Sequence, residues 1–171
     1  MEEAGLVVEY DAVGNLFASS SVSDPDGVEI WMGSHLDSVP DGGRYDGPLG
    51  VLVALEAAMR VETRARLTVI VFRDEEGTRF GNGCLGSRSL VGPVGNDELQ
   101  LRDADGVTLA DALSALGLQL PERPWVRGRP HAFIEAVGFQ YSDLASGGAS
   151  LVVVDQTVET VVALDSACEE T

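Results

Sequence analysis

The sequence contains no lysine, only two cysteines, and no apolar run that approaches the roughly 18 residues a membrane span needs. The cysteines, Cys84 and Cys168, lie far apart and form no CxxC pair, so a thiolate zinc site is not expected. The first residues lack the basic and apolar regions of a signal peptide. We therefore expect a cytoplasmic protein that meets no membrane and whose chemistry depends on carboxylates.

Positive charge is also scarce. Eleven basic residues, all of them arginine, stand against 28 acidic ones, which gives a net charge of −17. Such a field repels phosphate backbones, so nucleic acid is not an expected partner. A salt-loving cytoplasm and a GC-rich genome that favours arginine codons both explain this acidic composition, and neither indicates a substrate. The length of 171 residues suits one domain with a hydrophobic core.

The hydrophobic pattern predicts an α/β fold. Residues 28–33 and 67–72 read as buried strands, and between them apolar residues recur every four positions from Leu49 onward, as in a helix. Shorter strands are expected at 6–10, 15–18, 132–135 and 151–155, and a short helix is expected after Thr108. Strand, loop, helix and strand in this order favour a parallel sheet, in which functional groups gather at the carboxyl ends of the strands.

The first group of candidate ligands follows the strand at 28–33. In an extended segment His35 and Asp37 face the same side, so His35 can bind a metal while Asp37 supports its other ring nitrogen or the site beside it. Asp46 comes eleven residues after His35, between glycines that let the chain turn back. Taken alone, a structural histidine and a turn aspartate are the better explanations of these residues.

The second group follows the strand at 67–72. Glu75 and Glu76 are adjacent, and neighbouring extended residues point in different directions, so one can bind a metal while the other acts on a water. Like charges raise each other's pKa unless a cation offsets them. A solvated acidic loop is the alternative. Together the two groups contain three clusters of suitable ligands, namely His35 with Asp37, Asp46, and Glu75 with Glu76. Their position at neighbouring strand ends nevertheless favours a metal site.

Three segments resemble the hydantoinase/carbamoylase family of metal-dependent amidases. Residues 33–51 read Gly-Ser-His-Leu-Asp-Ser-Val-Pro-Asp-Gly-Gly-Arg-Tyr-Asp-Gly-Pro-Leu-Gly-Val, residues 74–81 read Asp-Glu-Glu-Gly-Thr-Arg-Phe-Gly, and residues 11–18 match the family's lead-in. The family includes N-carbamoyl-L-amino-acid hydrolases, allantoate amidohydrolases and β-ureidopropionases. The resemblance implies a metallo-aminopeptidase-like catalytic domain with a mostly parallel mixed sheet, and hydrolysis of linear C–N bonds in N-carbamoyl amino acids, ureido acids or allantoate.

The resemblance also implies roles for individual residues. It implies two divalent ions, of zinc, manganese or cobalt. His35 would bind one ion, Asp46 would bridge both, and Glu76 would bind the other. Glu75 would be the general base on the attacking water, and Asp37 would support His35. The substrate would be a small molecule, but no residue that binds it is indicated.

The resemblance breaks near residue 135. The family's next block reads close to Glu-Leu-His-Ile-Glu-Gln-Gly, and its histidine is a metal ligand. Glu135 aligns with the first glutamate, but Val137 stands at the histidine position, and His131, six residues earlier, is expected at the surface. We therefore expect a partial catalytic metal-binding domain at 1–135. Residues 136–171 would be a divergent tail, as from a shifted reading frame or a fragmentary gene.

Segments that the intact family carries are also not found. The dimerisation domain and the last metal-binding histidine are absent, so the family's homodimer is doubtful here and impaired activity is expected. Two alternatives to a carbamoylase stay open. One is a catalytically dead fragment that binds a metal or a partner, and the other is an aminopeptidase or deacylase of the broader metallopeptidase group.

Overall fold

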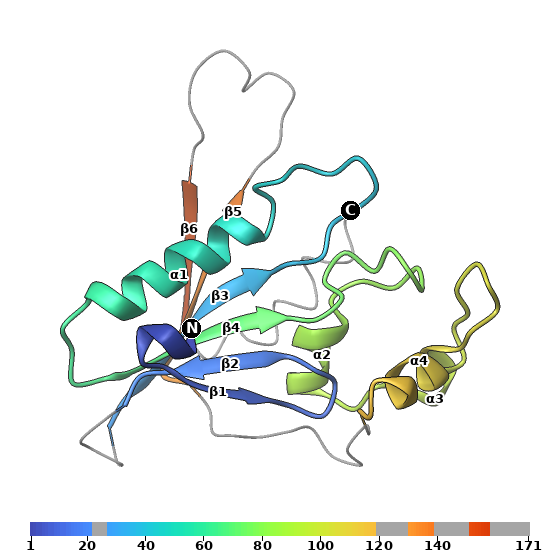
Figure 1. Ribbon diagram of the computed structural model, residues 1–171, viewed down its shortest axis with the longest axis horizontal. Helices are drawn as coiled ribbons and strands as arrows, with labels where there is room; N and C mark the ends of the chain where they lie inside the picture. The colour runs from blue at the N-terminus through green and yellow to red at the C-terminus, as the bar shows by residue number, and fades with distance from the viewer. Residues whose placement is uncertain (22–26, 119–129, 139–150, 158–171) are drawn as a thin grey trace.

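The protein has three layers in the computed structural model, which describes residues 1–21, 27–118, 130–138 and 151–157. A sheet of six strands in the order β1-β2-β4-β3-β5-β6 has helix α1 on one face and α2 on the other (Figure 1). The strands are β1 (Val7–Tyr10), β2 (Leu16–Ser19), β3 (Glu29–His35), β4 (Arg66–Phe72), β5 (Ala132–Gly138) and β6 (Leu151–Thr157). The helices are η1 (Glu2–Ala4), α1 (Pro48–Arg60), α2 (Leu85–Val91), α3 (Asn96–Leu99) and α4 (Leu109–Ala115).

The sheet is mixed, which confirms the α/β class expected from the sequence. Strand β3 pairs in parallel with both β4 and β5, and α1 makes the crossover from β3 to β4. The pairs β1–β2, β2–β4 and β5–β6 are antiparallel. Parallel pairing is thus confined to the three central strands, a smaller share than expected. One reason is that the turn between β1 and β2 is too short for the crossover that a parallel pair requires.

Both faces of the central strands are buried in apolar side chains. On the α1 face, Ala54 packs in one cluster with Met32 and Val69. The opposite face is aromatic, and its cluster contains Phe17, Trp31, Ile70, Phe72 and Phe133, with Leu90 of α2 against it. The alternation of side chains along β4 serves both clusters, as the two-residue period of a strand requires. This double burial holds the ends of β3 and β4 in fixed positions.

Close contact between β3 and β4 depends on a glycine. A Cβ built on Gly33 would lie 1.9 Å from the carbonyl oxygen of Ile70, so no larger residue fits there without a backbone shift. The register then places His35 beside Phe72, so the segments that follow the two strands leave the sheet at the same edge. This carboxyl edge is where the predicted ligands lie.

A buried polar network ties the β1–β2 turn to the same edge. The Asp11 carboxylate accepts the main-chain N–H groups of Val13, Gly14 and Asn15. The Asn15 side chain in turn accepts the N–H of Arg73 at 2.9 Å and donates to the carbonyl oxygen of Gly86, also at 2.9 Å. The start of the loop after β4 and the first turn of α2 are therefore held by one buried asparagine.

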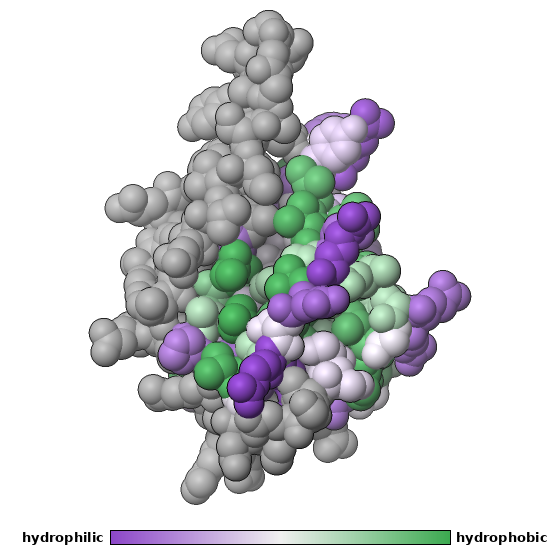
Figure 2. Space-filling view, turned by 90° about the vertical axis from the view of Figure 1, so that its left-hand side faces the viewer, coloured by the Kyte–Doolittle hydropathy of each residue, from purple (hydrophilic) through white to green (hydrophobic). Residues whose placement is uncertain are grey.

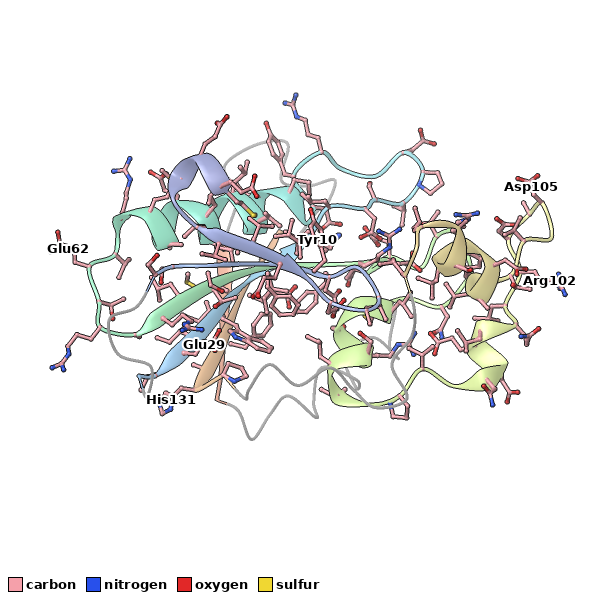
Figure 3. All side chains as sticks on the ribbon, turned by 60° about the horizontal axis from the view of Figure 1, so that its bottom comes forward. Tyr10, Glu29, Glu62, Arg102, Asp105 and His131 are labelled. Carbon is pink, nitrogen blue, oxygen red and sulfur yellow. The ribbon has the colours of Figure 1, made fainter. Side chains whose placement is uncertain are left out.

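The opposite end of the sheet carries His131. In Figure 3, Glu29 and His131 lie at the same end of the molecule, far from Arg102 and Asp105, and the His131 N–H donates to the Glu29 carbonyl oxygen at 2.7 Å. His131 is exposed, as expected from the sequence. Figure 2 faces this end, where hydrophobic and hydrophilic residues lie interspersed among the residues drawn in colour.

The expected boundary at residue 135 stays a prediction. Strand β5 continues through this position to Gly138, and β6 pairs with β5, while most of 136–171 lies outside the described residues. Within the described part of the chain, every helix is too short or too polar to cross a bilayer.

Removal of the Asn15 side chain should destabilise the fold. Asn15 is fully buried, and Asn15→Ala would remove its hydrogen bonds to the Arg73 N–H and to Asp11 Oδ2, each at a cost of about 1–3 kcal/mol. The Gly86 carbonyl oxygen keeps its bond from the Ser89 hydroxyl. We expect the free energy of unfolding, measured by urea denaturation, to fall by about 2–6 kcal/mol. The exposed Asn96→Ala is the control, and an equal change in both variants would contradict the role given to the network.

Candidate metal centre

Three side chains converge at the carboxyl edge of the sheet. One ligand atom from each of His35, Glu75 and Glu76 lies within 4.8 Å of the other two. His35 ends β3 and is buried. The two glutamates are half-buried and lie in the loop that follows β4, the strand next to β3 in the sheet. The sequence predicted all three as functional residues, and the parallel pairing of β3 with β4 brings them together.

The His35 ring is held in one orientation. Its Nδ1 lies 3.0 Å from the main-chain oxygen of Asp37, and its Nε2 lies 3.6 Å from Glu75 Oε2. If Nδ1–H donates to the carbonyl oxygen, Nε2 keeps its lone pair and faces the carboxylates, as a metal ligand must. A glycine is required next to the ring, because a Cβ on Gly47 (φ +76°) would lie 2.6 Å from its Cε1. The ring is therefore confined between the backbone at Asp37 and the backbone at Gly47.

Asp37 holds the loop after β4 as well as the histidine. Its carboxylate lies 3.7 Å from His35 Nδ1, which is longer than the bond that the main-chain oxygen makes. The two carboxylate oxygens instead accept the main-chain N–H groups of Glu75, at 3.2 Å, and Glu76, at 2.9 Å. The support for His35 that the sequence predicted thus comes from the Asp37 backbone, and the carboxylate fixes the two glutamates.

Asp46 lies near this group but does not belong to it. Its side chain is half-buried, and its main-chain N–H donates to the Gly43 carbonyl oxygen at 3.2 Å. Its negative charge raises the pKa values of both Glu75 and Glu76. The third residue of the cluster, beside His35 and Glu76, is Glu75 and not Asp46. The resemblance implies Glu75 as the general base.

The carboxylates crowd one another. Burial raises the pKa of Glu75, and the charges of Glu76, Asp37 and Asp46 raise it further, while His35 opposes the shift. Burial also raises the pKa of Glu76, with Asp46 and Asp37 adding to it and His35 opposing it. A divalent cation would offset this repulsion. An imidazole nitrogen and carboxylate oxygens are donors that zinc, manganese and cobalt accept, so the residues present fit such an ion.

Glu135 aligns with the first glutamate of the segment Glu-Leu-His-Ile-Glu-Gln-Gly in the amidase family, but the sequence predicted no role for it. This residue lies in β5, beside β3, and its Oε1 is 3.5 Å from the Ser34 hydroxyl. Burial raises its pKa to about 7, and the charge of Glu75 raises it too, while His35 and Ser34 act in the opposite direction. An acid that directly follows the apolar run 132–134 was the signal in the sequence.

Comparison with known proteins agrees with this geometry. The sequence pattern of peptidase family M28 matches residues 15–121. The chain is 42% identical over 143 residues to an N-carbamoyl-L-amino acid amidohydrolase of Geobacillus stearothermophilus, which covers 79% of this chain and 35% of the relative. It is 34% identical over 129 residues to an allantoate deiminase of Arabidopsis thaliana, covering 71% of this chain and 25% of the relative.

A solved structure of an amidase also resembles this chain. A hydantoinase/carbamoylase family amidase from Burkholderia ambifaria superposes with a TM-score of 0.71 at 38% identity, over 85% of this chain and 37% of that one. A histidine–carboxylate cluster at the carboxyl edge of parallel strands is typical of hydrolytic metalloenzymes, and the chain belongs to peptidase family M28. Its relatives place it with the hydantoinase/carbamoylase amidases, of which it spans about a third of the length.

Loss of the Asp37 carboxylate charge should weaken metal binding. In Asp37→Asn only one side-chain oxygen remains, and the new NH₂ would face a main-chain N–H of Glu75 or Glu76. We expect the affinity for Zn²⁺, measured by competition with a chromophoric chelator, to fall about 10–100-fold, as is typical for groups that hold ligands in place. Ser38→Ala, at an exposed hydroxyl that donates to the Val39 carbonyl oxygen, is the matched control. An unchanged affinity in Asp37→Asn would contradict this role.

The metal-free chain should lose stability as the pH rises. Glu135 has a folded-state pKa of about 7 against an ordinary value of 4.5, so the folded state binds its proton more tightly than the unfolded state. The resulting stabilisation is fully present below about pH 4.5 and is lost as the pH rises through about 7. Urea denaturation midpoints measured in EDTA should therefore fall between about pH 5 and pH 8, and Glu135→Gln should flatten this slope. A midpoint that rises over this interval would contradict the assignment.

Proposed function

We propose that this protein is a metal-dependent hydrolase of linear C–N bonds, acting on N-carbamoyl amino acids, ureido acids or allantoate. The observation that carries the proposal is the convergence of His35, Glu75 and Glu76 at the carboxyl edge of the sheet. Relatives named as an N-carbamoyl-L-amino acid amidohydrolase, an allantoate deiminase and a ureidoglycolate hydrolase support the substrate class.

The proposed cofactor is a pair of divalent ions. His35, Asp46 and Glu76 would hold them, with Asp46 shared, and zinc, manganese or cobalt suits these donors. When bound, such ions polarise a carbonyl and lower the pKa of water. Asp46 lies close enough for its charge to act on both glutamates, which supports its place in the set.

Glu75 is the proposed general base. Its half-buried carboxylate takes the proton of the attacking water and delivers it to the leaving nitrogen. Burial and the neighbouring carboxylates raise its pKa, which makes it a better proton acceptor than an exposed glutamate. The bond from its main-chain N–H to Asp37 fixes its position relative to His35. The same loop thus supplies a ligand and a base from adjacent residues.

We propose that activity is impaired in the chain as given. The resemblance assigns a metal-binding histidine to position 137, where this chain has valine. Gly33 pairs with Glu135, so His35 and Val137 each follow two residues further along neighbouring strands. Valine has no metal-binding atom, so position 137 offers no ligand. A catalytically dead fragment is the limiting form of this proposal.

A substrate panel tests the activity. The purified chain, with added Zn²⁺, Mn²⁺ or Co²⁺, is assayed on N-carbamoyl-L-amino acids, allantoate, ureidoglycolate and dipeptides. We expect slow or no turnover of the linear C–N substrates and none of the dipeptides. Turnover of dipeptides alone would favour the aminopeptidase alternative. Fast carbamoylase turnover with two tightly bound ions per chain would contradict the impairment.

Location and partners are inferred from the same site and from composition. We infer a small-molecule substrate, a cytoplasmic location, and no nucleic-acid or membrane partner, because the net charge of −17 opposes anionic surfaces. The homodimer of the intact family stays doubtful for this chain, and sedimentation of the purified protein would decide it.

The two adjacent glutamates should differ in their effects. Glu76→Gln should abolish metal binding, because it removes a ligand charge from the cluster. Glu75→Gln should leave most metal binding intact and, in a full-length relative carrying the matching change, lower the rate by about 10²–10⁴-fold. Metal binding is measured by chelator competition and the rate by release of the free amino acid. Equal loss of metal in the two variants would contradict this division of roles.

A further inference from the structure

Glu135 is a half-buried acid that the proposed mechanism does not use. It lies in β5 opposite Gly33 of β3, a position where the neighbouring strand has no side chain. Its carboxyl group interacts electrostatically with Glu75 and His35, two members of the cluster. The third central strand of the sheet thus adds a carboxylate to a site that β3 and the loop after β4 build.

Packing alone does not explain this residue. Its one hydrogen bond is to the Ser34 hydroxyl, at the long distance of 3.5 Å, and no arginine pairs with it among the residues that the structure describes. A carboxyl group taken out of water without a positive partner costs free energy. Burial accordingly raises its pKa to about 7, in a direction that a nearby cation would reverse.

We propose that Glu135 is an outer carboxylate of the metal centre, whose negative charge strengthens the binding of a divalent cation at His35 and Glu76. It lies outside the group formed by His35, Glu75 and Glu76, so it acts on the ion through space or through water. Its contribution is charge, and not the shape of the side chain. The inference rests on the proposed function, because it requires a cation at that cluster.

Charge and shape are separated by substitution. Glu135→Gln keeps the size and the hydrogen bond to Ser34 but removes the charge, and Glu135→Leu removes both the charge and the polar head. Glu135→Asp keeps the charge. The matched control is Glu29→Gln, because Glu29 is a half-buried glutamate that also accepts a hydroxyl, that of Thr68 at 2.7 Å, at the opposite end of β3.

The affinity for Zn²⁺ is measured on the whole 171-residue chain by chelator competition at pH 8, with the fold of each variant checked by circular dichroism. We expect Glu135→Gln to lower the affinity about 10-fold or more, within the range for groups around a ligand set. Glu135→Leu should lower the Zn²⁺ affinity by a similar factor. The test therefore needs only one of these two neutral variants to fold. Glu135→Asp and Glu29→Gln should each stay within about threefold of the unmodified chain.

Four results would overturn the proposal. Unchanged affinity in the neutral variants would show that the charge contributes nothing, and neither neutral variant folding would show that Glu135 serves the fold. Equal loss in Glu135→Asp would show that shape is what counts. If the unmodified chain binds no Zn²⁺, Mn²⁺ or Co²⁺, both this inference and the metal site of the proposed function fail. Binding by the unmodified chain with no effect of Glu135 removes the inference alone.

Discussion

The hydrogen bonds from the main-chain N–H groups of Glu75 and Glu76 to the Asp37 carboxylate connect the ends of two neighbouring strands. His35 precedes Asp37 by two residues, so the same short segment positions the imidazole and the two glutamates. Without this connection the loops after β3 and β4 would be separate acidic segments. With it, ligand atoms from both strands lie within 4.8 Å of one another. The site is thus one unit in which an aspartate sets the geometry and other side chains supply the donors.

That arrangement concentrates negative charge where a protein normally avoids it. Glu75, Glu76 and Glu135 all have raised pKa values, and burial is the largest cause in each case. A fold can maintain such crowding only when other interactions stabilise it, and the doubly covered central strands and the Asp11–Asn15 network do so here. Binding of a cation would relieve the repulsion, so the same groups that weaken the metal-free protein favour the metal-bound one.

Strand β5 contains both Glu135, which matches the amidase pattern, and Val137, which departs from it. Strand β5 supplies Glu135 next to Gly33, and two residues further on the resemblance calls for a histidine where this chain has valine. The chain spans about a third of its relatives, and the donors it contains come from β3, the loop before α1 and the loop after β4. A cation bound by these residues alone has fewer strong ligands than the family's pattern provides, which gives a carboxylate such as Glu135 more influence on its affinity.

The sequence by itself determined the fold class, strands β3 and β4 to within one or two residues and, through the Gly-Ser-His and Asp-Glu-Glu-Gly segments, the family. The same segments put forward His35, Glu75 and Glu76 as candidates, which the structure brings together. These are local signals, because alternation, glycine placement and motif spacing are written in consecutive residues. The tertiary structure alone decided that the Asp37 carboxylate holds the glutamates while its backbone holds His35, and that Asp46 stands beside the cluster. It also decided that Glu135 lies opposite Gly33, beside Ser34, where the charge of Glu75 raises its pKa. Those facts depend on strand order and register, which join residues up to a hundred positions apart, as Ser34 and Glu135 are. No pattern within a single segment carries that information.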